Sequence, residues 1–252
     1  SLVNYKEQLD FAINASDWVN LERLVESVEV YLPTISQAQK HVLRLQYLSE
    51  WWKPLNIGRI LLERRSPKYL QFVIDSFSDS KFKSLFLRDF APPIDKPSEL
   101  EAELAAEYLA PPFVQKNAHW VVIASDEPLG FISLCDIDFR HRKAELLVGF
   151  PGESRSLTSV GSTLMLIEHA FSRLGIEKLY SFVHVDNELS QKSTESLGFQ
   201  NEGILQGEFL ERSTGRRLSL YRNGLLASDF ESSDRIKNLL SRLSHRKVAA
   251  SG

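Results

Sequence analysis

The sequence has little of several features that would point to particular classes of protein. Its 252 residues include a single cysteine, Cys135, which excludes an internal disulfide and a thiolate metal cluster. We expect this thiol to be buried and inert, because it lies in a run that reads as a strand. No apolar run is long enough to span a membrane, and the first residues show no signal-peptide pattern.

An excess of charge of one sign is also absent. The chain has 30 lysine and arginine residues against 33 aspartate and glutamate residues, whereas a nucleic-acid-binding protein would show a basic excess. Its 6 histidines show no metal-ligand spacing, so we predict no metal site. Hydrophobic residues make up 43% of the chain, which supports a sizeable core. The composition is typical of a cytoplasmic enzyme with no nucleic-acid or membrane partner, and it leaves the oligomeric state open.

Hydrophobic spacing divides the chain into three parts. Residues 1–55 carry only helical patterns and form an N-terminal helical module. Residues 56–230 begin with strand and helix patterns, then show an antiparallel hairpin and a strand–helix–strand crossover. Residues 231–252 read as a C-terminal helical tail. We therefore predict an α/β fold, in which helices flank a mixed, mostly antiparallel sheet and residues 53–58 join the added helical module to it.

Several details of the helices follow from local signals. Ser16-Asp17 precedes a periodic run and should supply the N-terminal cap and an acidic first turn of a helix. Ile13 and Val42 fall on the apolar faces of two other helices, so we expect both to be buried. Ser98 should cap a helix that extends to Leu109.

The stretch from Lys143 to Phe199 has the pattern of a phosphate-binding unit. It reads as a strand over 143–150, a loop of small residues over 154–162 that opens a helix, and a second strand over 178–186. Free backbone N–H groups and the positive end of the helix dipole both favour an anion at such a loop. The unit closes with Asn187 after the second strand and with Gly198-Phe199 after a short helix.

At these residues the chain resembles the GNAT superfamily of acyl-coenzyme A-dependent N-acyltransferases, particularly the branch that contains the ribosomal-protein N-acetyltransferases. The resemblance covers roughly residues 56–230. The family's loop usually reads Gln/Arg-x-x-Gly-x-Gly/Ala and grips the coenzyme A pyrophosphate, and its three marked places here hold Ser156, Ser159 and Gly161. The resemblance implies transfer of an acyl group from acetyl-coenzyme A, or another short acyl-coenzyme A, to a primary amine.

The resemblance also implies where the co-substrate binds. In the GNAT fold two neighbouring strands splay apart and expose main-chain groups to the pantetheine arm, and strand 143–150 should be one of this pair. The residues that it assigns to coenzyme A are Leu147, Val148, Phe150, Ser156, Leu157, Thr158, Ser159, Val160, Gly161, Ser162 and Asn187.

Glu145 is one candidate for the general base that removes the proton of the amine. It lies eleven positions before Ser156, and the catalytic glutamate of the histone-acetylating GNAT branch stands at that separation. The alternative is a structural ion pair of Glu145 with Arg142 or Lys143.

His184 is the competing candidate. Strand alternation puts it on one face with Tyr180 and Phe182, and an imidazole titrates near neutrality. A purely structural histidine is the alternative for this residue. Thr194 stands where many GNAT enzymes have the tyrosine that protonates the leaving thiolate, so the general acid is not identified.

A fold of this kind does not name its acceptor. We expect a small-molecule amine, foremost a nucleotide-linked amino sugar, because Phe182 stands where enzymes of protein N-termini have a histidine. Segment 98–112 is long enough to cover a cleft, and Arg140, Arg142 and Lys143 would meet the pyrophosphate. Two alternatives stay open: an acetyltransferase of protein N-termini or ribosomal proteins, and a noncatalytic module that binds acyl-coenzyme A.

Overall fold

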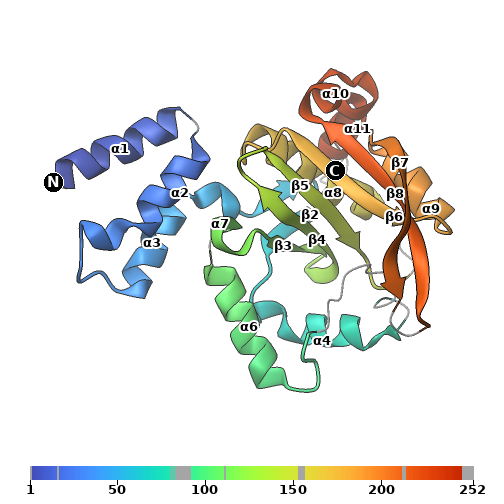
Figure 1. Ribbon diagram of the computed structural model, residues 1–252, viewed down its shortest axis with the longest axis horizontal. Coiled ribbons are helices and arrows are strands. Elements are labelled where there is room, and N and C mark those ends of the chain that lie inside the picture. The colour runs from blue at the N-terminus through green and yellow to red at the C-terminus, as the bar shows by residue number, and fades with distance from the viewer. Residues whose placement is uncertain are drawn as a thin grey trace, which may run out of the picture.

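One sheet organises the molecule. The computed structural model describes residues 2–15, 17–80, 82, 92–110, 112–152, 157–211 and 214–245. Within these ranges eight strands pair in the order β1-β2-β3-β4-β5-β6-β8-β7 (Figure 1). The strands are β1 (Leu55–Ile57), β2 (Ile60–Arg64), β3 (Ala118–Ala124), β4 (Glu127–Asp138), β5 (Lys143–Gly149), β6 (Lys178–His184), β7 (Gln200–Glu211) and β8 (Arg216–Leu226).

Strand directions and flanking helices agree with the predicted fold class. Neighbouring strands are antiparallel except β5 and β6, which run parallel. The described helices and 3-10 turns (η) are α1 (Leu2–Asn14), α2 (Trp18–Glu26), η1 (Val28–Val30), α3 (Gln37–Tyr47), η2 (Ser49–Trp51), η3 (Pro67–Tyr69), α4 (Leu70–Ser78), α6 (Pro97–Leu109), α7 (Pro112–Gln115), α8 (Leu157–Ser172), α9 (Glu188–Ser196), α10 (Ala227–Ser232) and α11 (Asp234–His245). The mixed, mostly antiparallel α/β fold is therefore confirmed.

Helices cover both faces of the sheet, because alternate residues of the central strands are apolar on each side. Trp120 and Ile132 belong to a core cluster that includes α8 and the N-terminal helices. Val121 and Phe131, on the opposite face, pack with α4 and α6. The β3–β4 hairpin turns through Ser125 and Asp126, both with positive φ, which suits the right-handed twist of the paired strands.

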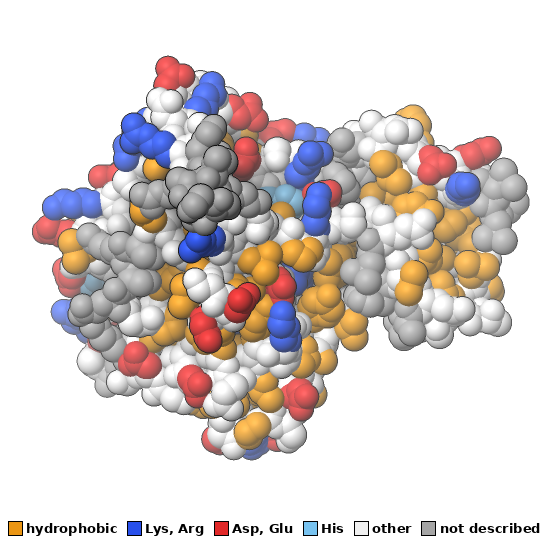
Figure 2. All heavy atoms as spheres, turned by 180° about the vertical axis from the view of Figure 1, so that it is seen from behind, with side chains coloured by type: hydrophobic (Ala, Val, Ile, Leu, Met, Phe, Trp, Pro, Cys, Tyr) orange, Lys and Arg blue, Asp and Glu red, His pale blue; other side chains and the backbone are white. Residues whose placement is uncertain are grey.

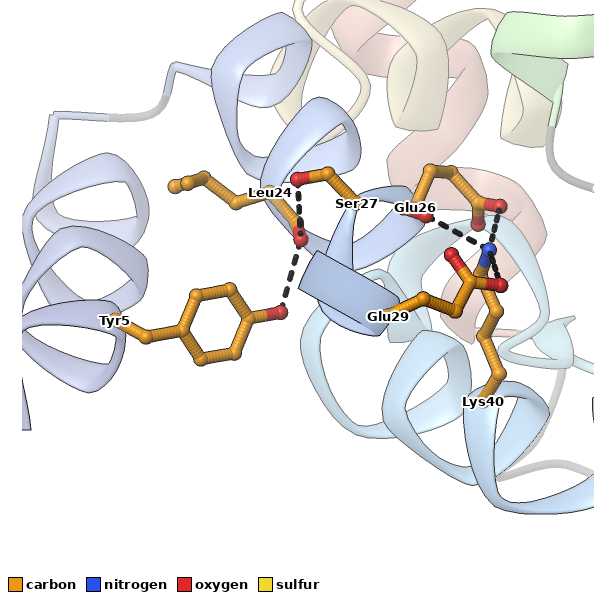
Figure 3. A network of polar contacts seen from close by, with 6 residues as sticks. All are labelled: Tyr5, Leu24, Glu26, Ser27, Glu29 and Lys40. Atoms are coloured by element: carbon orange, nitrogen blue, oxygen red, sulfur yellow. Dashed lines mark hydrogen bonds and ion pairs between the residues drawn. The ribbon is translucent and has the colours of Figure 1, made fainter. Parts of the chain in front are cut away.

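Helices α1, α2 and α3, together with the turns η1 and η2 and Trp52, form a lobe beside the sheet (Figure 1). Figure 3 shows polar contacts inside this lobe. The Tyr5 hydroxyl donates to the Leu24 carbonyl at 2.9 Å, and burial raises the pKa of Tyr5 to about 12. Lys40 is 7% exposed, and its Nζ donates to the Glu26 carbonyl at 2.7 Å and to Glu29 Oε1 at 3.0 Å. These bonds satisfy groups that would be costly to bury unpaired.

Arg64 of β2 fastens the lobe to the sheet. It is 3% exposed, and its guanidinium lies 5.4 Å from the ring centroid of Trp52 and 5.5 Å from that of Trp120. Arg64 Nη1 donates to the Trp51 carbonyl at 2.9 Å, and Trp52 Nε1 donates to the Tyr108 carbonyl at 2.7 Å. Burial lowers the pKa of Arg64 to about 10, so the side chain stays charged at neutral pH. Figure 2 shows hydrophobic side chains gathered along this junction and on the lobe.

Asp17 is the residue that caps α2, since its Oδ1 accepts the N–H of Asn20 at 3.1 Å, and Ser16 lies outside the described residues. The join at 53–58 contains β1, which pairs with β2 and becomes the edge of the sheet. Three other local predictions are wrong. Ile13 is 40% exposed and Val42 60% exposed, because helical spacing alone does not say which flank of the apolar stripe meets a neighbour. The predicted cap at Ser98 is also wrong, because α6 begins with Pro97 and its N-terminus has no side-chain cap.

The junction predicts what the lobe contributes to stability. A shortened chain that begins at Lys53 would lose Trp51 and Trp52 and expose Trp120 and the charge of Arg64. We expect this chain to melt at a lower temperature and to bind more of a hydrophobic dye than the full chain. Calorimetry and dye fluorescence measure both effects. An unchanged melting temperature with full activity would show that the lobe is dispensable.

His169 of α8 makes a second contact with the lobe. It is 7% exposed, and its Nε2 donates to the Glu50 carbonyl at 2.8 Å. Burial lowers the pKa of His169, as do the nearby charges of Lys53 and Arg173, while Glu50 opposes this effect. The folded chain therefore binds fewer protons than the unfolded chain, and stability is lost as the pH falls below the ordinary histidine pKa of about 6.5.

We expect the melting temperature of the wild-type chain to fall between about pH 7 and pH 5.5 more steeply than that of His169→Gln. The glutamine keeps an N–H donor for the Glu50 carbonyl but takes up no proton in this range. His141→Gln serves as the control, since His141 is exposed and contacts Asp138 at the surface. Parallel melting curves for wild type and His169→Gln would contradict this assignment.

Candidate functional site

The parallel strands β5 and β6 pair over only part of their length. Their register joins Lys143 to Lys178, Ala144 to Leu179 and Glu145 to Tyr180, and ends there. Beyond this point β5 stays paired with β4 and β6 with β8. The two strands therefore separate, as expected from the resemblance, and the edge of β5 that faces β6 is open from residue 146 onward. An open edge inside a sheet presents backbone N–H and C=O groups that a ligand can satisfy.

Two predicted coenzyme A contacts lie on this open edge of β5, namely Leu147 and Val148. Val148 is 39% exposed. Phe150 follows the strand, and its ring lies directly against the backbone of Gly130, where a Cβ would collide with it. Glycine at position 130 therefore makes room for the ring of Phe150, since any other residue would place a Cβ there.

Glu145 occupies the last paired position, at the point where the strands diverge. It is 5% exposed, opposite Cys135 on one side and Tyr180 on the other. Alternation places Glu145 on the sheet face of Phe131, together with Tyr180. A buried carboxylate thus lies at the origin of the open edge.

The predicted faces of β6 agree with the structure. Leu179, Ser181 and Val183 are buried, whereas Tyr180, Phe182 and His184 are half-buried on the Glu145 face. Cys135 is buried, with 3% exposure, as expected for an inert thiol.

His184 has a defined hydrogen-bonding arrangement. Its Nδ1 accepts the N–H of Asp186 at 3.2 Å and lies 3.7 Å from Asp186 Oδ2. Its Nε2 is buried and has no hydrogen-bond partner among the described residues. With the Nδ1 lone pair engaged, a neutral ring carries its proton at Nε2 and can donate from that atom but not accept.

Helix α8 begins at Leu157 and is the next described element after β5 in the chain. The first-turn amides of Leu157, Thr158 and Ser159 have no intrahelical acceptor and lie at the positive end of the helix dipole. Leu157 is 50% exposed, so this end is accessible. The predicted contact Ser156 lies outside the described residues.

The next three predicted residues lie further along the same helix. Val160, Gly161 and Ser162 lie within α8, where backbone amides are used by the helix itself. A Cβ at Gly161 would lie 2.9 Å from Ile60 Cδ1, so this glycine allows α8 to pack closely on β2. Ser162 is 0% exposed, and its Oγ donates to the Thr158 carbonyl at 2.7 Å. Contact of these three residues with the coenzyme A phosphates stays a prediction.

Asn187 follows β6 and caps α9, because its Oδ1 accepts the N–H of Ser190 at 3.1 Å. The cap fixes the side chain beside the end of β6. His119 and Ser133, whose Nδ1 and Oγ are 2.7 Å apart, lie on the same sheet face as Glu145.

Sequence reasoning missed Arg222 of β8. Register places it opposite Phe182, and its guanidinium lies 5.5 Å from the ring centroid of Tyr180. Only the pairing of β6 with β8 brings it there, and no local signal in the sequence reveals that register. The described residues contain no cluster of histidine, cysteine or carboxylate side chains that could hold a metal ion. None of the described helices is long and apolar enough to cross a membrane.

Comparison with known proteins is consistent with this geometry. A family model described as an acetyltransferase (GNAT) domain matches residues 59–200, more than half of the chain. Spermidine N(1)-acetyltransferase of Escherichia coli (strain K12) is 28% identical over 138 residues, which cover 53% of this chain and 74% of the relative. The uncharacterized N-acetyltransferase YoaA of Bacillus subtilis (strain 168) is 22% identical over 172 residues, which cover 66% of this chain and 94% of YoaA.

Solved structures share the fold. A GCN5-related N-acetyltransferase from Brucella melitensis has a TM-score of 0.61 and 19% identity, covering 76% of this chain and 86% of its own. Spermidine N-acetyltransferase from Vibrio cholerae, in complex with CoA and spermine, has a TM-score of 0.56 and 22% identity, covering 69% of this chain and 99% of its own.

The helix start can be tested by removing one amide. Leu157→Pro places proline at the first helical position, where it fits the helix but has no N–H. We expect its affinity for coenzyme A to fall about tenfold, the effect of one lost hydrogen bond to a charged group. Leu157→Ala keeps the amide and serves as the matched control. Calorimetric titration in which both variants bind as the wild type does would remove this helix start from the site.

Proposed function

The chain belongs to the GNAT acetyltransferase family, and on this basis we propose that it transfers the acetyl group of acetyl-coenzyme A to a primary amine of a small molecule. Membership makes it an acyl-coenzyme A-dependent N-acyltransferase with acetyl-coenzyme A as co-substrate. The observation that carries the proposal is the separation of β5 from β6 at Glu145. At this separation an open backbone edge begins beside a buried carboxylate.

The residues present fit the co-substrate. Backbone groups of Leu147 and Val148 would hold the pantetheine arm, and the first-turn amides of α8 would hold the diphosphate. The diphosphate is an anion, which the positive helix end favours over the pantetheine or a cation. Acetyl-coenzyme A supplies the thioester, and the chain supplies position and proton transfer.

Glu145 takes the proton of the amine in this proposal. An alkyl ammonium must lose a proton before its nitrogen can attack the acyl carbon. The C–N bond then forms, the C–S bond breaks, and the sulfur leaves as a thiolate that is protonated from solvent or from a nearby donor. Glu145 is favoured over His184 because a neutral His184 ring carries a proton at Nε2 while Asp186 engages Nδ1.

Two classes of acceptor are candidates within small amines. The sequence predicts a nucleotide-linked amino sugar, for which Phe182 lies on the Glu145 face in place of the histidine of protein N-terminal enzymes. A polyamine is the second, because the similar Escherichia coli protein is named a spermidine N(1)-acetyltransferase. Arg142, one of the predicted pyrophosphate contacts, pairs with Glu177 at 2.6 Å in the turn before β5.

The proposed activity is tested by release of free thiol from acetyl-coenzyme A in the presence of amines of each class and of short peptides. We expect release with small amines. Release with peptides alone would favour an acetyltransferase of protein N-termini. Binding of coenzyme A without release for any amine would favour a noncatalytic binding module.

Glu145→Gln should lower kcat roughly 100-fold or more, because the amide keeps the shape of the side chain but accepts no proton. The rise of the rate with pH should also flatten, since attack then depends on amine that is already neutral in solution. His184→Phe is the paired variant and should keep that rise. A near-native rate in Glu145→Gln together with a large loss in His184→Phe would reverse the two roles.

A further inference from the structure

Basic side chains line the wall beside Glu145. On β5, alternation puts Lys143 on the same face as Glu145, and the parallel register places Lys178 opposite Lys143 and Tyr180 opposite Glu145. The two lysines are thus immediate neighbours of the site on the paired side of the splay. Lys178 keeps 31% of its side chain exposed, so its ammonium is accessible.

Arg222 extends this wall from β8. Tyr180 lies opposite Gly224 and Phe182 opposite Arg222, so Arg222 shares the face of Glu145. The guanidinium lies 5.5 Å from the ring centroid of Tyr180, and the side chain is 39% exposed. A planar guanidinium against an aromatic ring is held in orientation while its remaining N–H groups stay free to bind.

One carboxylate, that of Glu202, pairs with both Lys178 and Arg222. Glu202 accepts from Lys178 Nζ, and its Oε2 lies 3.4 Å from Arg222 Nε. The hydrogen bond from Lys178, with help from Arg222, lowers the pKa of Glu202, so it stays ionised. Glu202 lies at an irregularity of the β7–β8 register, over the backbone of Gly224, where a Cβ would collide with its carboxylate.

Three cations lie on this face of the sheet. Lys178 and Arg222 share Glu202, whereas Lys143 lies opposite Asp138 and acts on the charge of that carboxylate. Among the described residues, Arg222 uses only its Nε on Glu202. A guanidinium with both terminal nitrogens available is suited to a phosphate or carboxylate, which it can bind through two parallel hydrogen bonds. A second ammonium of a polyamine would meet this guanidinium at the same place.

We propose, building on the proposed acetyl transfer, that the acceptor carries an anionic group close to its primary amine and that Arg222 and Lys178 bind this group beside Glu145. Phosphate and carboxylate share the required chemistry. Such an acceptor is not a polyamine, which is the class in the name of the similar Escherichia coli spermidine N(1)-acetyltransferase. In this proposal Arg222 determines which amine binds.

The test uses amines that differ only in an anionic group. Glucosamine is compared with glucosamine 6-phosphate, ethanolamine with phosphoethanolamine, and cadaverine with lysine, each with acetyl-coenzyme A; spermidine is included. We expect kcat/KM to be at least about tenfold higher for an anionic member of a pair. In Arg222→Gln, KM for the amine with the anionic group should rise about tenfold, with kcat nearly unchanged. KM for the amine without that group, and KM for acetyl-coenzyme A, should stay the same.

Lys192→Gln is the charge control, because it removes one cation from α9, where Lys192 is 72% exposed and pairs only loosely with Glu188. Arg222→Lys keeps the charge but loses the two-pronged donor, and should fall between wild type and Arg222→Gln. Equal use of both members of every pair, preference for spermidine, or the same loss in Arg222→Gln and Lys192→Gln would overturn the inference. Absence of thiol release with all amines would instead refute the proposed acetyl transfer.

Discussion

The site depends on one constraint, which is that β5 and β6 pair in parallel at three positions and no further. Because β4 and β8 hold the outer edges of the two strands, neither can move in to close the gap. The backbone groups on the inner edges are left for water or a ligand to satisfy, which a continuous sheet would not permit. The divergence begins at Glu145, which is buried.

Helix α8 connects this constraint to the rest of the molecule. It follows β5 in the chain, Gly161 lets it pack against Ile60, and His169 contacts the carbonyl of Glu50 in the lobe. The lobe is outside the residues 59–200 that match the family, yet it shares one core cluster with α8 and with Trp120. We infer that the lobe stabilises the position of α8, so that removal of the lobe would also shift the first turn of this helix.

Much of the architecture could be predicted from the sequence, because it rests on local signals. The cap before Trp18, the alternation along β6 and the parallel crossover each depend on residues close together in the chain. Features that depend on distant partners or on very short segments could not be predicted. The packing of Gly161 against Ile60 joins residues far apart in the sequence, and β1 is too short to carry a strand pattern. The exposed position of Val42 depends on which side of α3 meets a neighbour.

Arg222 shows why the acceptor is harder to predict than the co-substrate. The groups proposed to hold acetyl-coenzyme A lie between β5 and α8, within the residues that match the family. Glu202 and Arg222 lie on β7 and β8, beyond residue 200, where the family match ends. The similarity that establishes the chemistry therefore does not reach the wall that would select the amine. Charge on that wall is set by β-strand register, so two members of one family can share Glu145 and its surroundings while binding acceptors of opposite charge.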